Sequence, residues 1–154
     1  MKIEEYLKTS PIFSVLRAQK LIDRELKDVL HLEEVNFLQA LLLITILLEG
    51  KHPISPGNLA EAFNCSKANI SKMLSYLEEK NWVCRNITIE DARKYDLYLS
   101  SEGLGKANRL LKILDNLESG IELEWKAERL QGFNVQLKSL ASLISKKNSS
   151  LQQF

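Results

Sequence analysis

Apolar residues recur every three or four positions along most of this chain, which is the spacing of one face of an α-helix. A short helix is expected at residues 1–8. Ser10-Pro11 then begins a longer helix, because serine caps helix N-termini and proline suits the first turn. Residues 33–49 include a very apolar run and end before Gly50, which predicts a buried helix closed by a glycine.

The last third of the chain has the same helical spacing. Residues 103–128 predict a long helix whose apolar side is Leu104, Ala107, Leu111, Leu114, Leu117 and Ile121. Gly120 interrupts this helix at a cost of roughly 1 kcal/mol relative to alanine, and an expected bend lies there. Gly132 predicts a break, after which a final apolar stripe indicates one more helix.

Between these flanks, two helices are predicted on either side of a tight turn. Ser55 caps a short helix whose expected buried side is Leu59, Ala62 and Phe63. Only two residues separate it from Ser66, which caps a second helix running to Lys80. That second helix has a single apolar stripe, made of Ile70, Met73, Leu74 and Leu77, and Asn81 beyond its end suits left-handed backbone. This is a helix-turn-helix arrangement.

The opposite face of the second helix carries small or cationic side chains that can approach a phosphate or a base edge: Ser66, Lys67, Asn69, Ser71 and Lys72. Either lysine can bind a phosphate or a guanine edge, and Asn69 can pair with adenine. Which residue makes which contact stays open. The plainer interpretation is an ordinary solvated helix face.

A β-hairpin is predicted directly after this helix. Residues 82–89 are rich in β-branched side chains, and residues 95–99 alternate apolar and polar positions. The residues between them form a charged turn. A hairpin behind a recognition helix is a wing, so the expected fold is mostly α with a small β-hairpin, a winged helix-turn-helix flanked by terminal helices.

The central region resembles the multiple-antibiotic-resistance regulator (MarR) family of winged-helix repressors. The resemblance rests on Ser55-Pro56-x-x-Leu59-Ala60, Leu77-Glu78-Glu79-Lys80-Asn81-Trp82-Val83-x-Arg85, Asp91-x-Arg93 and Leu99-Ser100-Ser101-Glu102-Gly103. Asn81 replaces the usual glycine, and Ser100 the usual threonine. The resemblance implies that Arg93, with Lys94 beside it, contacts DNA from the wing. Asp91 cannot contact DNA favourably, so we expect it to steady the wing by pairing with Arg85 or Arg93.

The flanking helices carry more apolar surface than a winged-helix core can cover. The simplest partner is a second copy in a two-fold dimer, and the family resemblance also implies dimerisation through terminal helices. We therefore expect one domain, residues 1–154, with a core at 33–103 and dimerisation regions at 1–32 and 104–154. Two recognition helices roughly 34–36 Å apart would read a pseudo-palindromic operator in double-stranded DNA.

Overall charge adds little, because 21 Lys and Arg balance 20 Asp and Glu. No signal peptide is visible, and the apolar run at residues 37–48 is too short to cross a bilayer. The cysteines, Cys65 and Cys84, suit a reducing compartment, so a cytoplasmic protein with no membrane partner is expected. Both cysteines are read as structural, and Cys84 beside Arg85 is the better candidate for a redox sensor.

The sequence gives less support to metal binding, catalysis or a defined effector pocket. His31 and His52 have no metal-ligand spacing with either cysteine. Phosphate loops, nucleophile elbows and metalloprotease motifs are absent from the sequence, so neither an enzyme nor a bound cofactor is expected. Aromatic residues Tyr6, Phe13, Trp125 and Phe133 either pack helices or line a pocket for a small aromatic effector, as the family resemblance allows. We predict a homodimeric transcriptional repressor relieved by a small ligand. The alternatives are a dimeric scaffold without DNA binding and a cysteine-based sensor.

Overall fold

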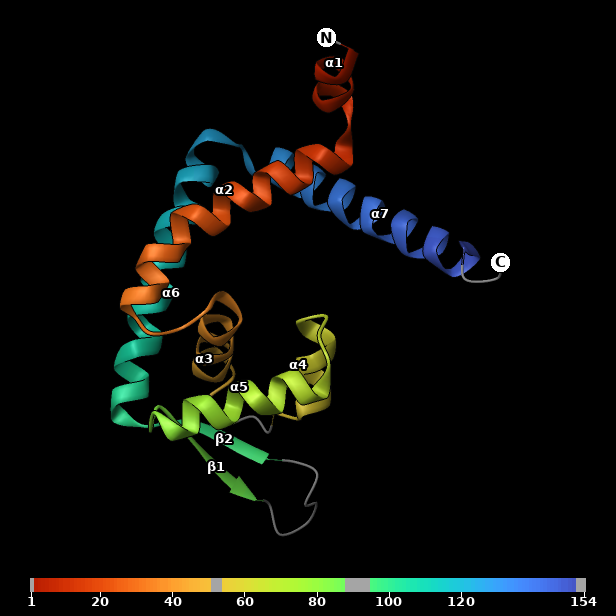
Figure 1. Ribbon diagram of the computed structural model, residues 1–154. Coiled ribbons are helices and arrows are strands. Elements are labelled where there is room, and N and C mark those ends of the chain that lie inside the picture. Colours follow the sequence, from red (N-terminus) through yellow and green to blue (C-terminus); the bar gives the residue numbers. More distant parts are fainter. Residues whose placement is uncertain (1, 51–53, 88–94, 152–154) are drawn as a thin grey trace. The chain divides into compact units, whose positions relative to one another are not determined.

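The computed structural model describes residues 2–50, 54–87 and 95–151, shown in Figure 1. Its elements are α1 (Lys2–Thr9), α2 (Pro11–Leu32), α3 (Phe37–Glu49), α4 (Pro56–Ala62), α5 (Lys67–Glu79), β1 (Val83–Ile87), β2 (Tyr95–Leu99), α6 (Ser101–Glu124) and α7 (Ala127–Leu151). Helices with a two-stranded antiparallel hairpin confirm the expected fold class. The chain divides into two compact units, residues 1–111 and 112–154.

The first two helices begin as the sequence predicts. α1 lies at the expected lead segment, and the Ser10 hydroxyl accepts a hydrogen bond from the Phe13 N–H at 3.2 Å to cap α2. α2 buries only Leu26 and Leu30 and leaves most of its other residues exposed. No single helix of the described residues is long and apolar enough to cross a membrane; α2 and α3 meet that test only together, and they are bent by 69°.

The predicted start of the third helix at Glu33 is wrong. α2 continues to Leu32, and α3 begins only at Phe37. Asn36 and Gln39 form a reciprocal capping box, in which each backbone N–H donates to the other side chain at 2.9 Å. These bonds satisfy N–H groups that would otherwise lack partners at the helix start. The prediction of Gly50 as the closing residue is confirmed by its φ of 62°.

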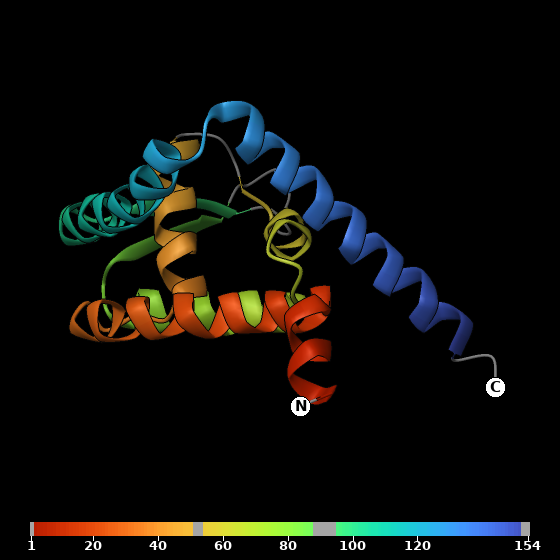
Figure 2. The same cartoon turned by 90° about the horizontal axis from the view of Figure 1, so that it is seen from above.

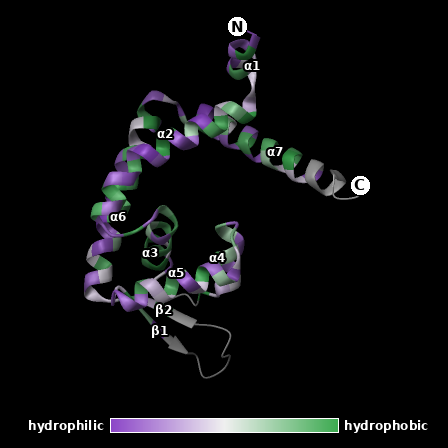
Figure 3. Ribbon diagram, in the orientation of Figure 1, coloured by the Kyte–Doolittle hydropathy of each residue, from purple (hydrophilic) through white to green (hydrophobic). Residues whose placement is uncertain are grey.

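α3 supplies much of the core of the first unit. Figures 1 and 2 show it surrounded by α2, α4, α5 and the start of α6, and Figure 3 shows its hydrophobic character. The buried residues of this core include Ala40, Leu42, Leu43, Ile44, Ile46, Leu59, Ile70, Met73, Leu74, Leu77, Trp82, Val83, Leu97, Ala107 and Leu110. Fully burying one such aliphatic side chain contributes roughly 1.5–3 kcal/mol, so this core stabilises the unit that carries α5.

The predicted hairpin follows α5, and its two strands pair antiparallel. Val83 lies opposite Leu99, and Arg85 lies opposite Leu97. Val83 and Leu97 are buried, so this face of the hairpin joins the core while Tyr98 points to solvent. The charged turn at 90–94 lies outside the described residues.

The second unit contains the end of α6 and all of α7. The predicted break at Gly132 is wrong, because α7 runs through it and the chain breaks instead at Trp125 and Lys126. A helical glycine costs only about 1 kcal/mol, which a long helix tolerates. The break allows the Trp125 ring to pack edge-on against Phe133 at 5.2 Å and under the Arg129 guanidinium at 4.7 Å. None of the described side chains of α7 is buried.

Candidate nucleic-acid interface

The turn between α4 and α5 is closed by backbone hydrogen bonds. Asn64, with a φ of 49°, donates its N–H to the Glu61 carbonyl at 3.1 Å, and Cys65 donates to the Ala60 carbonyl at 2.9 Å. The buried side of α4 is Leu59 and Ala60. The prediction that Ala62 and Phe63 are buried there is wrong: Ala62 is exposed and Phe63 half-buried, because this left-handed turn begins directly after them.

α5 presents the predicted polar face. The Ser66 hydroxyl accepts a hydrogen bond from the Asn69 N–H at 3.2 Å and so caps the helix. The residues at 70, 73, 74 and 77 are buried as predicted. All five predicted recognition-helix residues, Ser66, Lys67, Asn69, Ser71 and Lys72, are exposed. The structure therefore brings two cations, an amide and two hydroxyls to one exposed helix end, where backbone N–H groups also favour anions.

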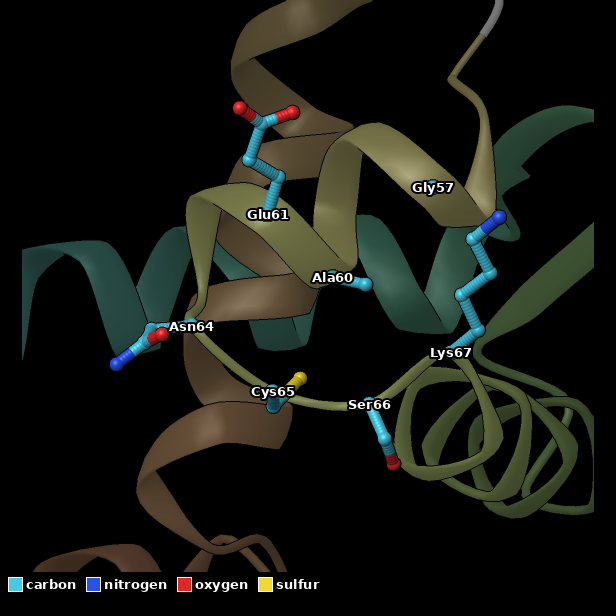
Figure 4. A pocket seen from close by; sticks show the side chains of 7 residues that line it. All are labelled: Gly57, Ala60, Glu61, Asn64, Cys65, Ser66 and Lys67. Atoms are coloured by element: carbon cyan, nitrogen blue, oxygen red, sulfur yellow. The ribbon is translucent and has the colours of Figure 1, made fainter. Parts of the chain in front are cut away.

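A shallow pocket of about 560 Å³ lies at the junction of α4 and α5. Its lining residues, drawn in Figure 4, are Gly57, Ala60, Glu61, Asn64, Cys65, Ser66 and Lys67. The Lys67 side chain extends toward the start of α4, where a Cβ added to Gly57 would lie 3.6 Å from the lysine Cε. The Glu61 carboxylate points away from that ammonium in Figure 4. The pocket thus has one cationic wall at the N-terminus of a helix.

Arg85 connects the first strand of the hairpin to α5. Its Nε and Nη2 donate to the two carboxylate oxygens of Glu78 at 2.8 and 2.9 Å, and both side chains are less than a third exposed. This two-pronged geometry fixes the guanidinium more firmly than a single bond would. The remaining predicted wing residues, Asp91, Arg93 and Lys94, lie outside the described residues. The Glu78 contact was missed by sequence reasoning, because no local spacing links a helix end to a strand.

Trp82 lies at the junction of α5, β1 and α6. Its carbonyl accepts from the Ser100 N–H at 3.1 Å, and a Cβ added to Gly103 would lie 1.9 Å from that same oxygen. Gly103 is therefore needed for a close backbone approach. Its own N–H donates to the Ser100 hydroxyl at 3.0 Å. The motif at residues 99–103 signals this helix start, but its contact with Trp82 is visible only in the structure.

The C-terminal end of α5 contacts the turn between α2 and α3. The Tyr76 hydroxyl donates to the Glu34 carbonyl at 2.7 Å, and the Lys80 ammonium lies 2.8 Å from the Glu34 carboxylate. The hydrogen bond between the Lys80 and Glu34 side chains lowers the pKa of Glu34 and raises the pKa of Lys80. Sequence reasoning missed this contact, because the partners are 46 residues apart.

The neighbouring carboxylate, Glu33, contacts α6. It accepts two hydrogen bonds from Arg109 at 3.2 Å, and its carbonyl accepts from the buried Lys106 ammonium at 2.7 Å. The Arg109 hydrogen bonds are the largest cause of a lowered pKa at Glu33; burial opposes them, and Lys106 adds to them. The Lys106 ammonium also lies 4.0 Å from the Trp82 ring centroid. The buried Lys106 ammonium is thus stabilised by Glu33 on one side and by the Trp82 ring on the other.

Both cysteines are free and half-buried; Cys65 lies in the turn before α5 and Cys84 in β1. Among the described residues, no group of three His, Cys, Asp or Glu side chains is arranged to bind a metal ion. The candidate effector residues Tyr6, Phe13 and Phe133 are exposed, and Trp125 is half-buried beside Phe133.

Known sequences share this central region. A sequence profile described as the MarR family matches residues 36–95. The HTH-type transcriptional regulator PrsX of Escherichia coli is 26% identical over 95 residues, which are 62% of this chain and 57% of PrsX. The HTH-type transcriptional repressor YetL of Bacillus subtilis is 33% identical over 70 residues, 45% of this chain and 42% of YetL. The matched region therefore spans about half the length of these curated relatives.

Solved structures share the fold. The Staphylococcus aureus MepR–DNA complex superposes with a TM-score of 0.79 at 16% identity, covering 89% of this chain and 98% of MepR. NadR in complex with 4-hydroxyphenylacetate superposes with a TM-score of 0.70 at 19% identity, covering 86% of this chain and 93% of NadR. At these identities the likeness concerns the fold.

Proposed function

We propose that this chain, whose residues 36–95 match the MarR family profile, binds double-stranded DNA in a sequence-specific manner and regulates transcription. The observation that carries this proposal is the exposed face at the start of α5, where Lys67, Asn69 and Lys72 lie on a helix capped and supported by a buried stripe. The matched relatives PrsX and YetL are named transcriptional regulators, and the matched MepR structure contains DNA. These names support the same assignment.

In this proposal α5 enters the major groove. Asn69 has the donor and acceptor needed to pair with adenine, while the two lysines bind guanine edges or phosphates. Ser66 and Ser71 hydrogen-bond to the backbone of the duplex. Arg93 and Lys94 contact DNA from the wing, and Asp91 and Arg85 steady that wing. The bond between Arg85 and Glu78 supports the latter role, since it ties β1 to α5.

We also propose a homodimer that reads a pseudo-palindromic operator. The exposed apolar residues of the terminal helices support this, among them Ile12, Leu16, Ile22, Leu117, Ile121, Leu123, Val135 and Leu143. A second copy that covered them would remove them from water. Sedimentation should report twice 17.6 kDa, and deletion of residues 120–154 should give monomeric or insoluble protein. A well-behaved full-length monomer at micromolar concentration would contradict the dimer.

We further propose that the protein is a repressor in the cytoplasm and that a small ligand relieves the repression. YetL is named a repressor, and the matched NadR structure holds an aromatic acid. Ligand relief predicts that an aromatic acid weakens operator binding in a titration; an operator affinity that no such compound alters would contradict it.

The test of DNA binding begins with selection of duplexes from a random library by the purified full-length chain. Asn69→Ala should then lose about 1–3 kcal/mol on the selected duplex and relax one position of the site. Lys27→Ala, which removes a cation from α2, is the control and should change neither. If the wild-type chain enriches no sequence, the proposal is wrong.

The wing is tested by salt dependence. Arg93→Ala should weaken binding and flatten the slope of log K against log salt by about 0.9, because one fewer counterion is released. Asp91→Ala should weaken binding while the slope stays at the wild-type value, since it removes no contact with DNA. An Arg93→Ala protein with unchanged affinity and slope would show that the wing does not contact DNA.

A further inference from the structure

Three helices of the first unit end in the same way, and one of them ends on an unusual residue. α2, α4 and α5 are each followed by a residue with positive φ, namely Glu34 at 56°, Asn64 at 49° and Asn81 at 58°. In each case the next residue donates its N–H to the carbonyl five positions back. This is the Schellman arrangement, where glycine is favoured and asparagine is tolerated. Glutamate is unfavourable in this conformation, so Glu34 points to a role for its side chain.

The Glu34 side chain extends to the end of α5. Its carboxylate lies 2.8 Å from the Lys80 ammonium, and its own carbonyl accepts the Tyr76 hydroxyl at 2.7 Å. Lys80 is the C-cap residue of α5, and Tyr76 lies one turn before it. Side chain and backbone of one residue therefore contact two successive turns of the recognition helix.

The same turn is anchored on its other side. Glu33 binds Arg109 and the buried Lys106 of α6, and Lys106 lies over the ring of Trp82, the second residue beyond Lys80. All of these residues belong to the first unit. The α2–α3 turn is thus joined to α6 by Glu33 and to α5 by Glu34, and Figure 1 shows it beside both helices.

Stability does not explain the choice of glutamate. The Glu34 side chain is 59% exposed and that of Lys80 is 35% exposed, so solvent screens their attraction. Glycine would adopt the positive φ at position 34 with less strain than glutamate. Glutamate is unfavourable for the backbone conformation at position 34, and its ion pair with Lys80 is weak. Its presence is therefore better explained if the Glu34 side chain orients α5.

We propose that Glu34 is a positioning residue for DNA recognition: through Lys80 and Tyr76 it sets the orientation of α5 and hence the match between its exposed face and the base edges. The inference rests on the proposed DNA binding. Without the carboxylate, α5 still folds, but its end is less restrained and must be ordered when DNA binds. Specific binding is affected more than non-specific binding, because only base contacts require an exact helix orientation.

Glu34→Gly tests the carboxylate separately from the backbone. Glycine suits the positive φ of this turn and keeps the carbonyl that accepts the Tyr76 hydroxyl. The matched control is Glu25→Gln, which removes a carboxylate from the exposed Arg24–Glu25 pair of α2 and changes the net charge equally. Full-length proteins would be titrated on a duplex selected by the wild type and on a scrambled duplex of the same composition. Selection from the random library would be repeated with each variant.

We expect Glu34→Gly to keep or raise the melting temperature while its ratio of specific to non-specific affinity falls about threefold to tenfold. Its selected site should be less sharply defined or differ in half-site spacing. Glu25→Gln should keep the wild-type ratio and site. Lys80→Met should reproduce the Glu34→Gly ratio, and the double variant should be no worse than either single one, because the two side chains act as a pair.

Two results would overturn the proposal while leaving DNA binding intact. One is a Glu34→Gly protein whose ratio and selected site equal those of the wild type. The other is a marked fall in its melting temperature, which would make the carboxylate a structural group. If the wild type itself enriches no duplex, the proposed function fails first, and the positioning role fails with it.

Discussion

Helices α3 and α5 of the first unit and the helices of the second unit carry similar apolar stripes, yet only α3 and α5 bury theirs. Leu42, Leu43 and Leu77 of the first unit are completely buried, whereas Leu123 and Leu143 of the second are 89% and 59% exposed. The stripes are equally regular in sequence. The difference shows that a helical repeat predicts which side of a helix is apolar and leaves open what covers it.

The cause lies in the number of neighbours that each helix has. α3 packs against α2 and β2, and α5 packs against α4 and β1, so apolar side chains are covered from several directions. A helix and the end of another, as in residues 112–154, form a single layer. One layer cannot enclose its own apolar face and needs a second for that. The predictions below test this contrast, from the largest effect to the smallest.

The largest effect is expected for Gly103→Ala in the first unit. The added Cβ would lie 1.9 Å from the Trp82 carbonyl, so α6 or the strand start must move. We expect a loss of about 4 kcal/mol or more in the free energy of unfolding, measured by urea denaturation. A change below about 1 kcal/mol would show that α6 does not depend on this close approach.

Leucine truncation compares the two units directly. Leu42→Ala should destabilise by about 2–5 kcal/mol at any protein concentration, because it leaves a cavity in a closed core. Leu143→Ala should matter only where a second copy covers it, so its effect on the melting temperature should depend on protein concentration. Equal, concentration-independent losses at both positions would contradict the contrast.

A smaller effect is expected at Glu33, which joins the α2–α3 turn to α6. Its pKa is lowered below the usual 4.5 mainly by hydrogen bonds from Arg109, so its contribution is complete above that pH and is lost as pH falls through the lowered pKa. Glu33→Gln should therefore be less stable than the wild type by roughly 1 kcal/mol at neutral pH. In thermal unfolding the difference should shrink progressively as the pH is lowered below 4.5. A difference that persists there would assign the effect to packing.

The smallest effect, of opposite sign, is expected for Gly120→Ala in the second unit. The position has open space around it and lies within α6, so alanine adds helix propensity without a clash. We expect stabilisation by about 0.5–1 kcal/mol, seen as a small rise in helical content and melting temperature. A loss instead would indicate that a second copy of the chain approaches this glycine closely, as in the proposed dimer.

Much of the local structure of the first unit follows from local sequence signals. The caps Ser10, Ser55 and Ser66, the left-handed Asn81 and the stripe of α5 are all confirmed, because each depends on residues within one helical turn. The errors are of another kind. The predicted start of α3 is too early because Glu33 is the C-cap residue of α2. The predicted break at Gly132 fails because a single glycine is only a weak helix breaker.

The sequence by itself therefore determined the helix-turn-helix, its exposed polar face and the hairpin behind it, since periodicity and capping act over a few residues. Tertiary structure decided that Glu34 contacts Lys80, that Glu33 contacts Lys106, and that Gly103 lies against Trp82. These partners are 46, 73 and 21 positions apart. No local pattern encodes such pairs, because each forms only when the core of α3 and α5 has brought separate helix ends together.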